Sequence, residues 1–333
     1  MSAVAEKNNR ELSPEILREL LRKMLLIRRF EEKIIEEYPV QDMKTPVHLY
    51  IGEEAIAAGV CLHLRKDDYI SSTHRSHGHC LAKGMDPKVL LAEFYGRANG
   101  CCRGKGGSMH PAAPELGIMG TSAIVGGGIG LAVGQALAAK MRGTGRISVP
   151  FFGDGAADEG IFHECLNFAS LKKLPVVFIC ENNYYSVNSP LSARHPQESI
   201  ALRAEGYGME GIALDGNDAV DVYLAAGEAV SKARHGGGPT LLECRTYRWK
   251  GHVGPECDHE KGCRSREELE EWIEKCPLEL HKGYLEKELL SEVEYNRLVR
   301  EIDADLDEAV RFARESPFPA EDELLNDLYC TGN

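Results

Sequence analysis

The stretch ISVPFFGDGAADEGIFHECLNFASLKKLPVVFICENNYYSV, residues 147–187, decides the fold. Its first apolar run, Ile147–Phe152, ends at a Gly-Asp-Gly turn, and a segment with apolar residues at helical spacing follows. Pro175 ends that segment and precedes a second apolar run, Val176–Cys180. Continuous runs rich in Val, Ile and Phe are typical of parallel strands that are buried on both faces. The stretch therefore predicts a β-α-β unit of an α/β fold, a doubly wound parallel sheet flanked by helices.

Polar residues follow both strands of this unit. Asp154 lies in the turn after the first strand, and Asn183 lies just after the second. Because a right-handed crossover brings both strand ends to one edge of the sheet, we expect the two side chains to face each other across a ligand crevice. Their oxygens suit Mg²⁺, which usually brings phosphate oxygens with it, and Gly153 and Gly155 allow a close backbone approach. The alternative is a sharp strand-to-helix turn in which Asp154 only caps the helix.

The same residues carry a resemblance to a known family. Gly-Asp-Gly followed by Asn-Asn after the next strand resembles the signature of thiamine diphosphate enzymes. Glu-Asn-Asn with a Tyr two residues later is similar to the α subunits of the E1 components of 2-oxoacid and acetoin dehydrogenases. Further motifs match family positions in order over roughly residues 15–330: HLYIGEEA (48–55), STHRSHGHCLAKG (72–84), GKGGSMH (104–110), IVGGG (124–128) and TYRWKGH (246–252).

The resemblance implies thiamine diphosphate and Mg²⁺ as cofactors. Asp154, Asn183 and the backbone oxygen of Tyr185 would hold Mg²⁺, and His252 would be the catalytic proton donor and carrier. The cofactor-binding residues that it implies are His74, Arg75, Ala123, Val125, Gly153, Asp154, Gly155, Ala156, Asn183, Tyr185 and His252. Two alternatives stay open: the segment around Arg75 is only a solvated polar loop, and His252 only orders its own loop. Ala123 also departs from the Gly of many relatives, which disfavours a positive φ there.

The resemblance also implies a reaction and partners. The enzyme would cleave the C–C bond of a 2-oxoacid such as pyruvate, or of acetoin, and pass the acyl unit to a lipoyl group on an acyltransferase, E2. The carboxylate that activates the cofactor lies on a separate β subunit in this family, so an α2β2 heterotetramer is expected. Two alternatives are a two-subunit thiamine enzyme with a non-lipoyl acceptor in biosynthesis and a scaffold without cofactor.

Composition limits the class of protein. The chain has 333 residues, 43% of them hydrophobic, and a net charge of −13. Without a basic stripe, no nucleic-acid partner is expected, and no run is apolar enough for a membrane span. Eleven irregularly spaced cysteines indicate reduced thiols in a cytoplasmic compartment.

The chain divides into three expected parts. They are an N-terminal tail and helix (1–45), a thiamine diphosphate-binding α/β domain (46–265) and a C-terminal helical extension (266–333). Residues 1–12 are expected to be disordered, and Ser13-Pro14 to begin a helix. Residues 45–84 are expected to form loops and helices. The spacing of His74, His77 and His79 disfavours a shared metal ion.

Overall fold

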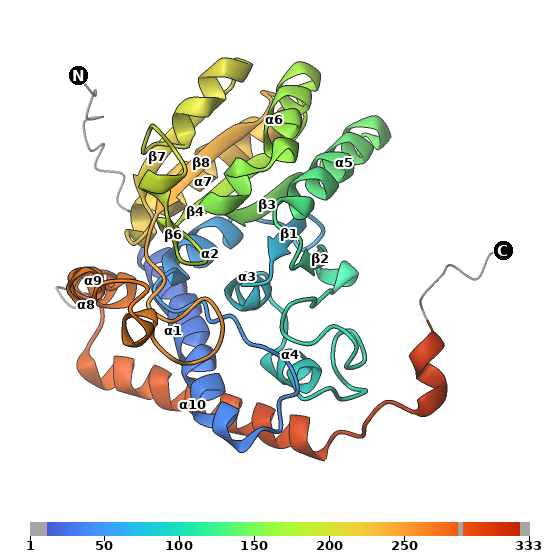
Figure 1. Ribbon diagram of the computed structural model, residues 1–333, viewed down its shortest axis with the longest axis vertical. Helices are drawn as coiled ribbons and strands as arrows, with labels where there is room; N and C mark the ends of the chain where they lie inside the picture. Colours follow the sequence, from blue (N-terminus) through green and yellow to red (C-terminus); the bar gives the residue numbers. More distant parts are fainter. Residues whose placement is uncertain (1–11, 286–288, 327–333) are drawn as a thin grey trace.

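The centre of the molecule is a parallel sheet with strand order β2-β1-β3-β4-β8-β7 (Figure 1). The computed structural model describes residues 12–285 and 289–326. The six strands are β1 (Tyr69–Thr73), β2 (Ile118–Ser122), β3 (Ser148–Gly153), β4 (Val177–Asn182), β7 (Glu210–Asp215) and β8 (Thr240–Arg245). A short antiparallel hairpin, β5 (Tyr185–Ser186) and β6 (Ser189–Pro190), follows β4.

The β-α-β unit predicted from residues 147–187 is confirmed. Strand β3 pairs in parallel with β4, with Phe151 opposite Ile179, and helix α6 (Gly160–Lys172) connects them. The helix begins later than the Gly-Asp-Gly turn, because residues Asp154–Asp158 first form a 3₁₀ turn. The N-cap of α6 is Glu159, so the alternative in which Asp154 only caps this helix is wrong.

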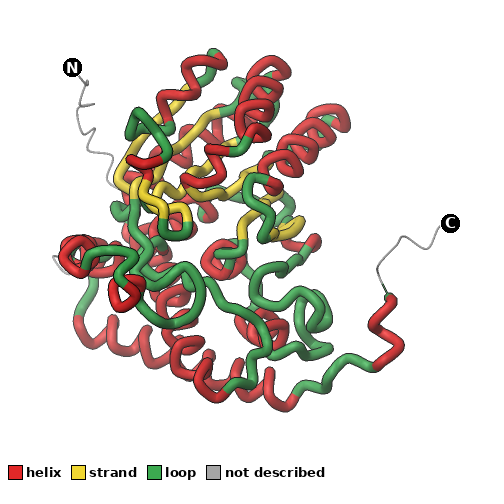
Figure 2. The backbone as a smooth tube through the Cα atoms, viewed as in Figure 1, coloured by secondary structure: helices red, strands yellow, loops and turns green. Residues whose placement is uncertain are grey.

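Both faces of the sheet carry helices, which confirms the doubly wound architecture (Figure 2). Successive strand residues point to opposite faces, and adjacent Phe151 and Phe152 accordingly enter two different apolar cores. Helices α5 (Gly127–Arg142) and α6 build the core that contains Phe152. Helices α2 (Glu54–Cys61) and α7 (Ala219–Arg234) build the other.

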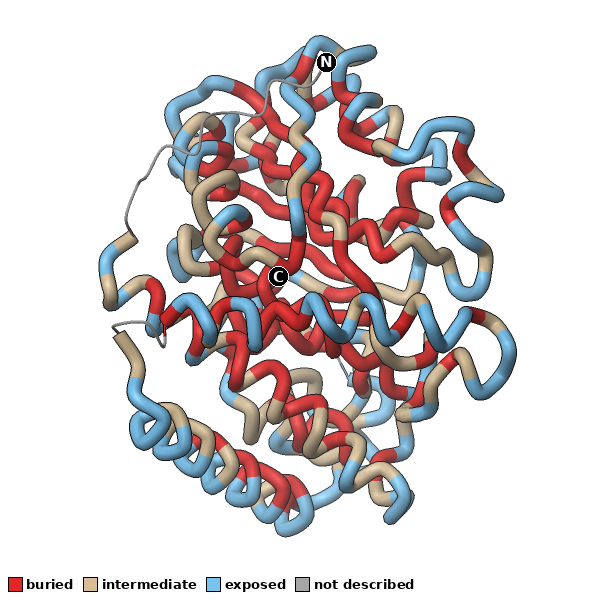
Figure 3. The backbone as a smooth tube through the Cα atoms, turned by 90° about the vertical axis from the view of Figure 1, so that its left-hand side faces the viewer, coloured by how far each residue is buried: buried red, intermediate tan, exposed pale blue. Residues whose placement is uncertain are grey.

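The remaining helices, except the one at Arg266–Ile273, extend the second of these cores, and Figure 3 shows the buried segments in the interior of the molecule. They are α1 (Pro14–Glu37), α3 (His77–Ala82), α4 (Pro87–Phe94), α8 (Arg266–Ile273), α9 (Pro277–Leu285) and α10 (Glu292–Glu315). As predicted, α1 begins at Pro14, and the Ser13 hydroxyl accepts a hydrogen bond from the backbone of Ile16. The apolar residues of α1, α9 and α10 join the core beneath the sheet. The boundaries proposed at residues 45 and 265 stay a prediction, and the expected disorder of the N-terminal tail concerns residues that lie almost wholly outside the described ranges.

One expectation is wrong: residues 45–84 contain a strand as well as loops and helices. Strand β1 reads YISST, and its Ser71 and Ser72 are buried although they are polar. The Ser72 hydroxyl lies 2.8 Å from His79 Nδ1, so a partner within the fold replaces water. Such a strand lacks the apolar run by which sequence patterns reveal buried strands.

Two further features concern the helices and the cysteines of the described residues. Among the described residues, no helix combines the length and the apolar character needed to cross a membrane. The cysteines of the described ranges are free thiols.

Candidate active site

The carboxyl ends of the central strands enclose a cavity of about 220 Å³. Its walls come from the residues that follow β1, β2, β3, β4 and β8, together with the segment before α2. All eleven cofactor-binding residues predicted from the sequence line this one cavity: His74, Arg75, Ala123, Val125, Gly153, Asp154, Gly155, Ala156, Asn183, Tyr185 and His252. The fold thus brings together residues that are up to 178 positions apart in sequence (252 − 74).

The Asp154 carboxylate is buried at one end of the cavity and forms an ion pair with Arg194. A second nitrogen of Arg194 lies 2.6 Å from Asp158. Burial raises the pKa of Asp154, and the Arg194 guanidinium opposes that rise. A metal ion that binds the Asp154 oxygen contacted by Arg194 therefore has to displace an arginine.

Asn183 lines the same cavity, and two hydrogen bonds fix its side-chain amide. Its amide nitrogen donates to Glu53 at 3.0 Å, and its amide oxygen accepts from the backbone of Tyr185 at 3.4 Å. The neighbouring turn contains two non-glycine residues in the left-handed region, Tyr184 (φ 66°) and Val187 (φ 55°). Such strain is kept where the surroundings require it, often at functional sites.

The residues around this turn fit Mg²⁺-diphosphate. The carboxylate of Asp154, the amide of Asn183 and the backbone of Tyr185 all offer the hard oxygen atoms that Mg²⁺ requires. At Gly155, a Cβ atom would lie 2.5 Å from the Ser186 hydroxyl oxygen, so a side chain there would require Ser186 to move.

Arg75 is a buried part of the cavity wall, so the alternative of a solvated polar loop is wrong. Its guanidinium donates to the backbone oxygens of Leu49 at 2.7 Å and His252 at 3.0 Å. Burial lowers its pKa to about 10, which still leaves it charged at neutral pH. This single cation therefore joins the segment before α2 to the loop after β8.

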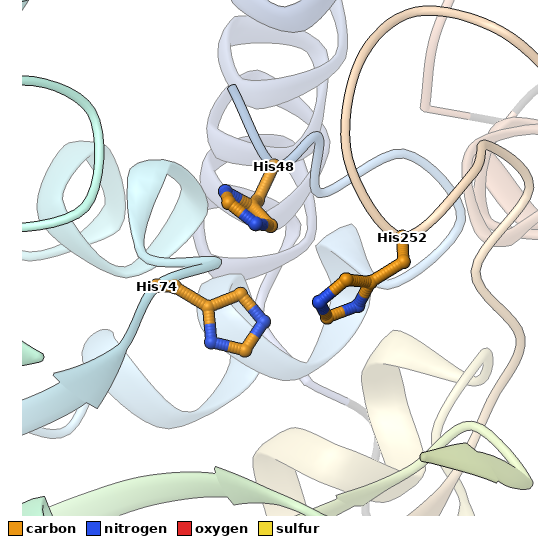
Figure 4. A group of neighbouring side chains, drawn as sticks. All are labelled: His48, His74 and His252. Carbon is orange, nitrogen blue, oxygen red and sulfur yellow. The ribbon is translucent and has the colours of Figure 1, made fainter. Parts of the chain in front are cut away.

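The histidines of the STHRSHGH motif separate into two groups. His77 faces Glu31 at 3.0 Å and Ser108 at 2.8 Å, and His79 faces Glu181 at 2.9 Å, so both are packing partners inside the core. His74 instead points into the cavity, where it meets His48 and His252 (Figure 4).

His252 lies on the cavity wall in a loop that several contacts fix. Gly254 of this loop donates to the Val47 oxygen at 2.8 Å, and Arg248 pairs with the buried Asp258 at 2.7 Å. Burial and the neighbouring Arg75 lower the pKa of His252 to about 4. The imidazole of His252 is therefore neutral at neutral pH.

The segment Ser122–Gly126 forms the most open wall. Ile124 is 72% and Val125 49% exposed, which is unusual for apolar residues at a cavity. Ala123 has no positive φ, so the replacement of Gly by Ala causes no strain there. Further along the adjoining helix α5, Leu131 and Met141 are exposed too.

Sequence reasoning missed several residues of this cavity, above all His48, Glu53, Glu181 and Arg248. Glu53 and Glu181 are buried carboxylates, and Glu181 accepts hydrogen bonds from Tyr50 and His79. Burial raises the pKa of Glu53 to about 7, and the negative charge of Glu181 adds to this rise. All four residues lie within motifs that carried the family resemblance. Their place in these motifs was the signal by which the sequence could have revealed them as cavity residues.

A parallel sheet with an Asp and an Asn at neighbouring strand ends, and an arginine in the same cavity, fits a diphosphate cofactor bound at the carboxyl edge of the sheet. The comparison with known proteins is more specific. A model of the family described as "Dehydrogenase E1 component" matches residues 22–321, and the chain belongs to this family.

The curated relatives agree with this assignment. The α subunit of acetoin:2,6-dichlorophenolindophenol oxidoreductase of Bacillus subtilis is 46% identical over 94% of this chain and 93% of its own length. Its counterpart from Cupriavidus necator is 40% identical, covering 96% of each chain. The pyruvate dehydrogenase E1 α subunit of Zymomonas mobilis is 39% identical over 94% of this chain and 88% of its own. The predicted family, fold and enzyme class are thus confirmed: the chain is an α-type E1 dehydrogenase component, a family that implies thiamine diphosphate.

Proposed function

We propose that this chain is the α half of a two-subunit thiamine diphosphate enzyme that cleaves the C–C bond of acetoin or of a 2-oxoacid such as pyruvate. The observation that carries the proposal is the cavity in which all eleven expected residues meet. Acetoin is the first candidate substrate, because two relatives at 46% and 40% identity are acetoin oxidoreductase subunits. Pyruvate is the second, because a relative at 39% identity is a pyruvate dehydrogenase subunit.

The cofactor would occupy the cavity with its diphosphate at the Asp154 turn. Asp154, Asn183 and the backbone oxygen of Tyr185 would hold Mg²⁺, while the backbone N–H groups of Gly155 and Ala156 would bind the diphosphate. Arg75 and His74 would lie beside the diphosphate, and the backbone around Ala123 and Val125 beside the aminopyrimidine ring. When bound, thiamine diphosphate supplies a carbanion that attacks carbonyl carbons.

His252 would position the reacting group and move its proton. Its neutral imidazole both accepts and donates hydrogen bonds, and its low pKa makes it a weak base that releases a proton readily. The backbone oxygen of His252 is fixed by Arg75, and its loop by the contact between Gly254 and Val47. These contacts keep the imidazole on the cavity wall while substrate enters.

The site would be completed by a β subunit. The cavity carboxylates of this chain already contact other side chains: Glu53 contacts Asn183, Asp154 contacts Arg194, and Glu181 contacts Tyr50 and His79. Glu53 keeps one oxygen without a hydrogen-bond partner among the described residues, but the family resemblance implies that the carboxylate that activates the aminopyrimidine comes from the β subunit. The exposed apolar side chains of Ile124 and Val125 at the open wall suit a protein partner. These features support an α2β2 heterotetramer.

The acyl unit would pass to the lipoyl group of an acyltransferase, E2. A non-lipoyl acceptor is the second candidate. Transfer of the acyl unit to an added lipoyl protein is expected only for the first. Many free thiols among the described residues support a reducing, cytoplasmic compartment.

The test is to produce the full chain with an E1 β subunit and to follow the reduction of 2,6-dichlorophenolindophenol. We expect activity that requires both subunits, Mg²⁺ and thiamine diphosphate, with acetoin preferred over pyruvate. The chain alone should be inactive and should bind the cofactor weakly. Robust turnover by the chain without any β subunit would refute the half-site, and no turnover of either substrate by the pair would refute the substrate class.

A further inference from the structure

Three imidazole rings meet in the cavity from three separate segments (Figure 4). His48 precedes α2, His74 follows β1, and His252 lies in the loop after β8. Their ring centroids form a nearly regular triangle, 4.6 Å between His48 and His74, 5.1 Å between His74 and His252, and 5.3 Å between His48 and His252. One ring nitrogen of each lies within 4.8 Å of the other two.

These rings are unlike the other buried histidines of the motif region. His77 and His79 have carboxylate and hydroxyl partners on their ring nitrogens. His48 is 94% buried, yet its Nδ1 atom has no hydrogen-bond partner in the described part of the chain. Because an unpaired buried polar atom lowers stability, such an atom in a cavity points to a ligand that pairs with it.

The chemistry of the three nitrogens selects the kind of ligand. Burial and the Arg75 charge lower the pKa of all three rings, to about 2 for His48, about 3 for His74 and about 4 for His252. Neutral imidazoles have a free nitrogen lone pair and suit Zn²⁺, Co²⁺, Ni²⁺ and Cu²⁺, whereas Mg²⁺ requires oxygen. A tetrahedral Zn²⁺ with ligands at about 2.0–2.1 Å needs nitrogens about 3.4 Å apart. The nitrogens lie within 4.8 Å of one another, so they have to approach one another by up to about 1.4 Å when the ion binds.

The charges around the triangle permit a cation. Arg75 and Arg248 are positive, but Glu53 lies 3.8 Å from Arg75 and Asp258 lies 2.7 Å from Arg248. Each of these arginines therefore has a carboxylate beside it, and Asp258 is shared with Arg264 at 3.2 Å. The second oxygen of the buried Glu53 also has no hydrogen-bond partner in the described residues.

We propose that His48, His74 and His252 bind one divalent transition-metal ion, with Zn²⁺ as the ion best suited to the site. Three imidazole nitrogens hold the ion, and its fourth position opens to the cavity. The site is separate from the oxygen ligands at Asp154 and Asn183 and does not depend on the proposed function. Because the ion sits on the wall that the substrate would contact, its binding blocks the cavity and inhibits any reaction there.

The experiment uses the full chain in buffer with excess Mg²⁺, which saturates oxygen sites. Addition of Co²⁺ should give the intense visible absorption of a low-coordinate ion at one equivalent per chain, and Zn²⁺ should displace it. His48→Gln, His74→Gln and His252→Gln should each weaken Zn²⁺ binding in calorimetry by at least roughly tenfold, the lower limit seen even for outer-shell partners. His235→Gln removes a histidine from the end of α7, away from the cavity, and should leave binding unchanged.

A second measurement keeps the test independent of how the variants fold. Electron paramagnetic resonance of the parent chain with one equivalent of Cu²⁺ should show coupling to three imidazole nitrogens. Coupling to fewer than three, or glutamine variants that are folded by circular dichroism and bind Zn²⁺ as the parent does, would refute the site. Absence of a stoichiometric Co²⁺ complex in the parent would refute it as well.

Discussion

In the proposed ion site, Arg194 would compete with Mg²⁺ for Asp154, and its removal should strengthen Mg²⁺ binding. The Asp154 carboxylate is 1% exposed and the Arg194 side chain 14%, so the pair is well shielded from water. In the proposed site, Mg²⁺ takes the place of this guanidinium. Replacing Arg194 with Gln removes the competing charge and leaves a neutral side chain of smaller reach.

The size of the effect follows from the bond that Mg²⁺ no longer has to break. A hydrogen bond to a charged group is worth about 1.5–3 kcal/mol. Since about 1.4 kcal/mol corresponds to a tenfold change in a binding constant, the Kd for Mg²⁺ should fall roughly 10- to 100-fold. The second contact of Arg194, at 2.6 Å to Asp158, is more exposed and contributes less.

Calorimetric titration of the full chain in complex with its β subunit, with Mg²⁺ at saturating thiamine diphosphate, measures this change. Arg203→Gln is the matched control, because it removes a nearby positive charge that contacts Ala157 and His195 but not Asp154. It should change the Kd far less than Arg194→Gln. Unchanged or weaker Mg²⁺ binding in Arg194→Gln, or an equal gain in both variants, would show that Arg194 does not compete for the ion.

Three further predictions concern the site and its loop. Asp154→Ala should abolish Mg²⁺-dependent cofactor binding, and unchanged affinity in calorimetry would contradict the proposed ion site. His252→Ala should leave cofactor binding nearly intact but slow turnover roughly 10²–10⁴-fold, the range for a lost acid–base group; a rate within about twofold of the parent would mean that His252 only orders its loop. Asp258→Asn leaves buried Arg248 without its charged partner, so the free energy of unfolding in urea should fall by about 3–5 kcal/mol, and a change under about 1 kcal/mol would contradict the importance of this pair.

A fifth prediction concerns pH. The pKa of His48 is lowered by burial to about 2 in the folded chain, so the unfolded chain binds its proton first as pH falls below about 6.5. Stability should therefore decrease from pH 7 to pH 5, and His48→Gln should reduce this decrease. Urea unfolding at both pH values tests this, and an equal decrease in parent and variant would contradict it.

The sequence was informative where one physical cause determines the pattern. Strands buried on both faces have to be continuously apolar, so the runs before Asp154 and Asn183 revealed β3, β4 and the crossover between them. Helix α1 was equally clear, because Ser13 and Pro14 mark its beginning. Strand β1 was missed, because two of its residues are serines, and the partner of the Ser72 hydroxyl, His79, is supplied only by the tertiary structure.

The sequence predicted which residues line the site, but not the contacts that these residues make. Motif positions identified eleven of the residues in the cavity wall. They gave no sign that Arg194, forty residues after Asp154 (194 − 154), reaches that carboxylate, or that His48 joins His74 and His252. Such contacts depend on how loops pack, and local sequence patterns do not contain that information.

The order of the strands also has a consequence for biosynthesis. Strand β4 lies between β3 and β8, and Val177 pairs with Thr240. During synthesis, the apolar edge of β4 therefore remains unpaired until the chain beyond α7 has left the ribosome. An exposed edge of this kind can pair with other nascent chains, and parallel pairings between distant segments form slowly. A nascent chain at this stage is thus a natural client for molecular chaperones.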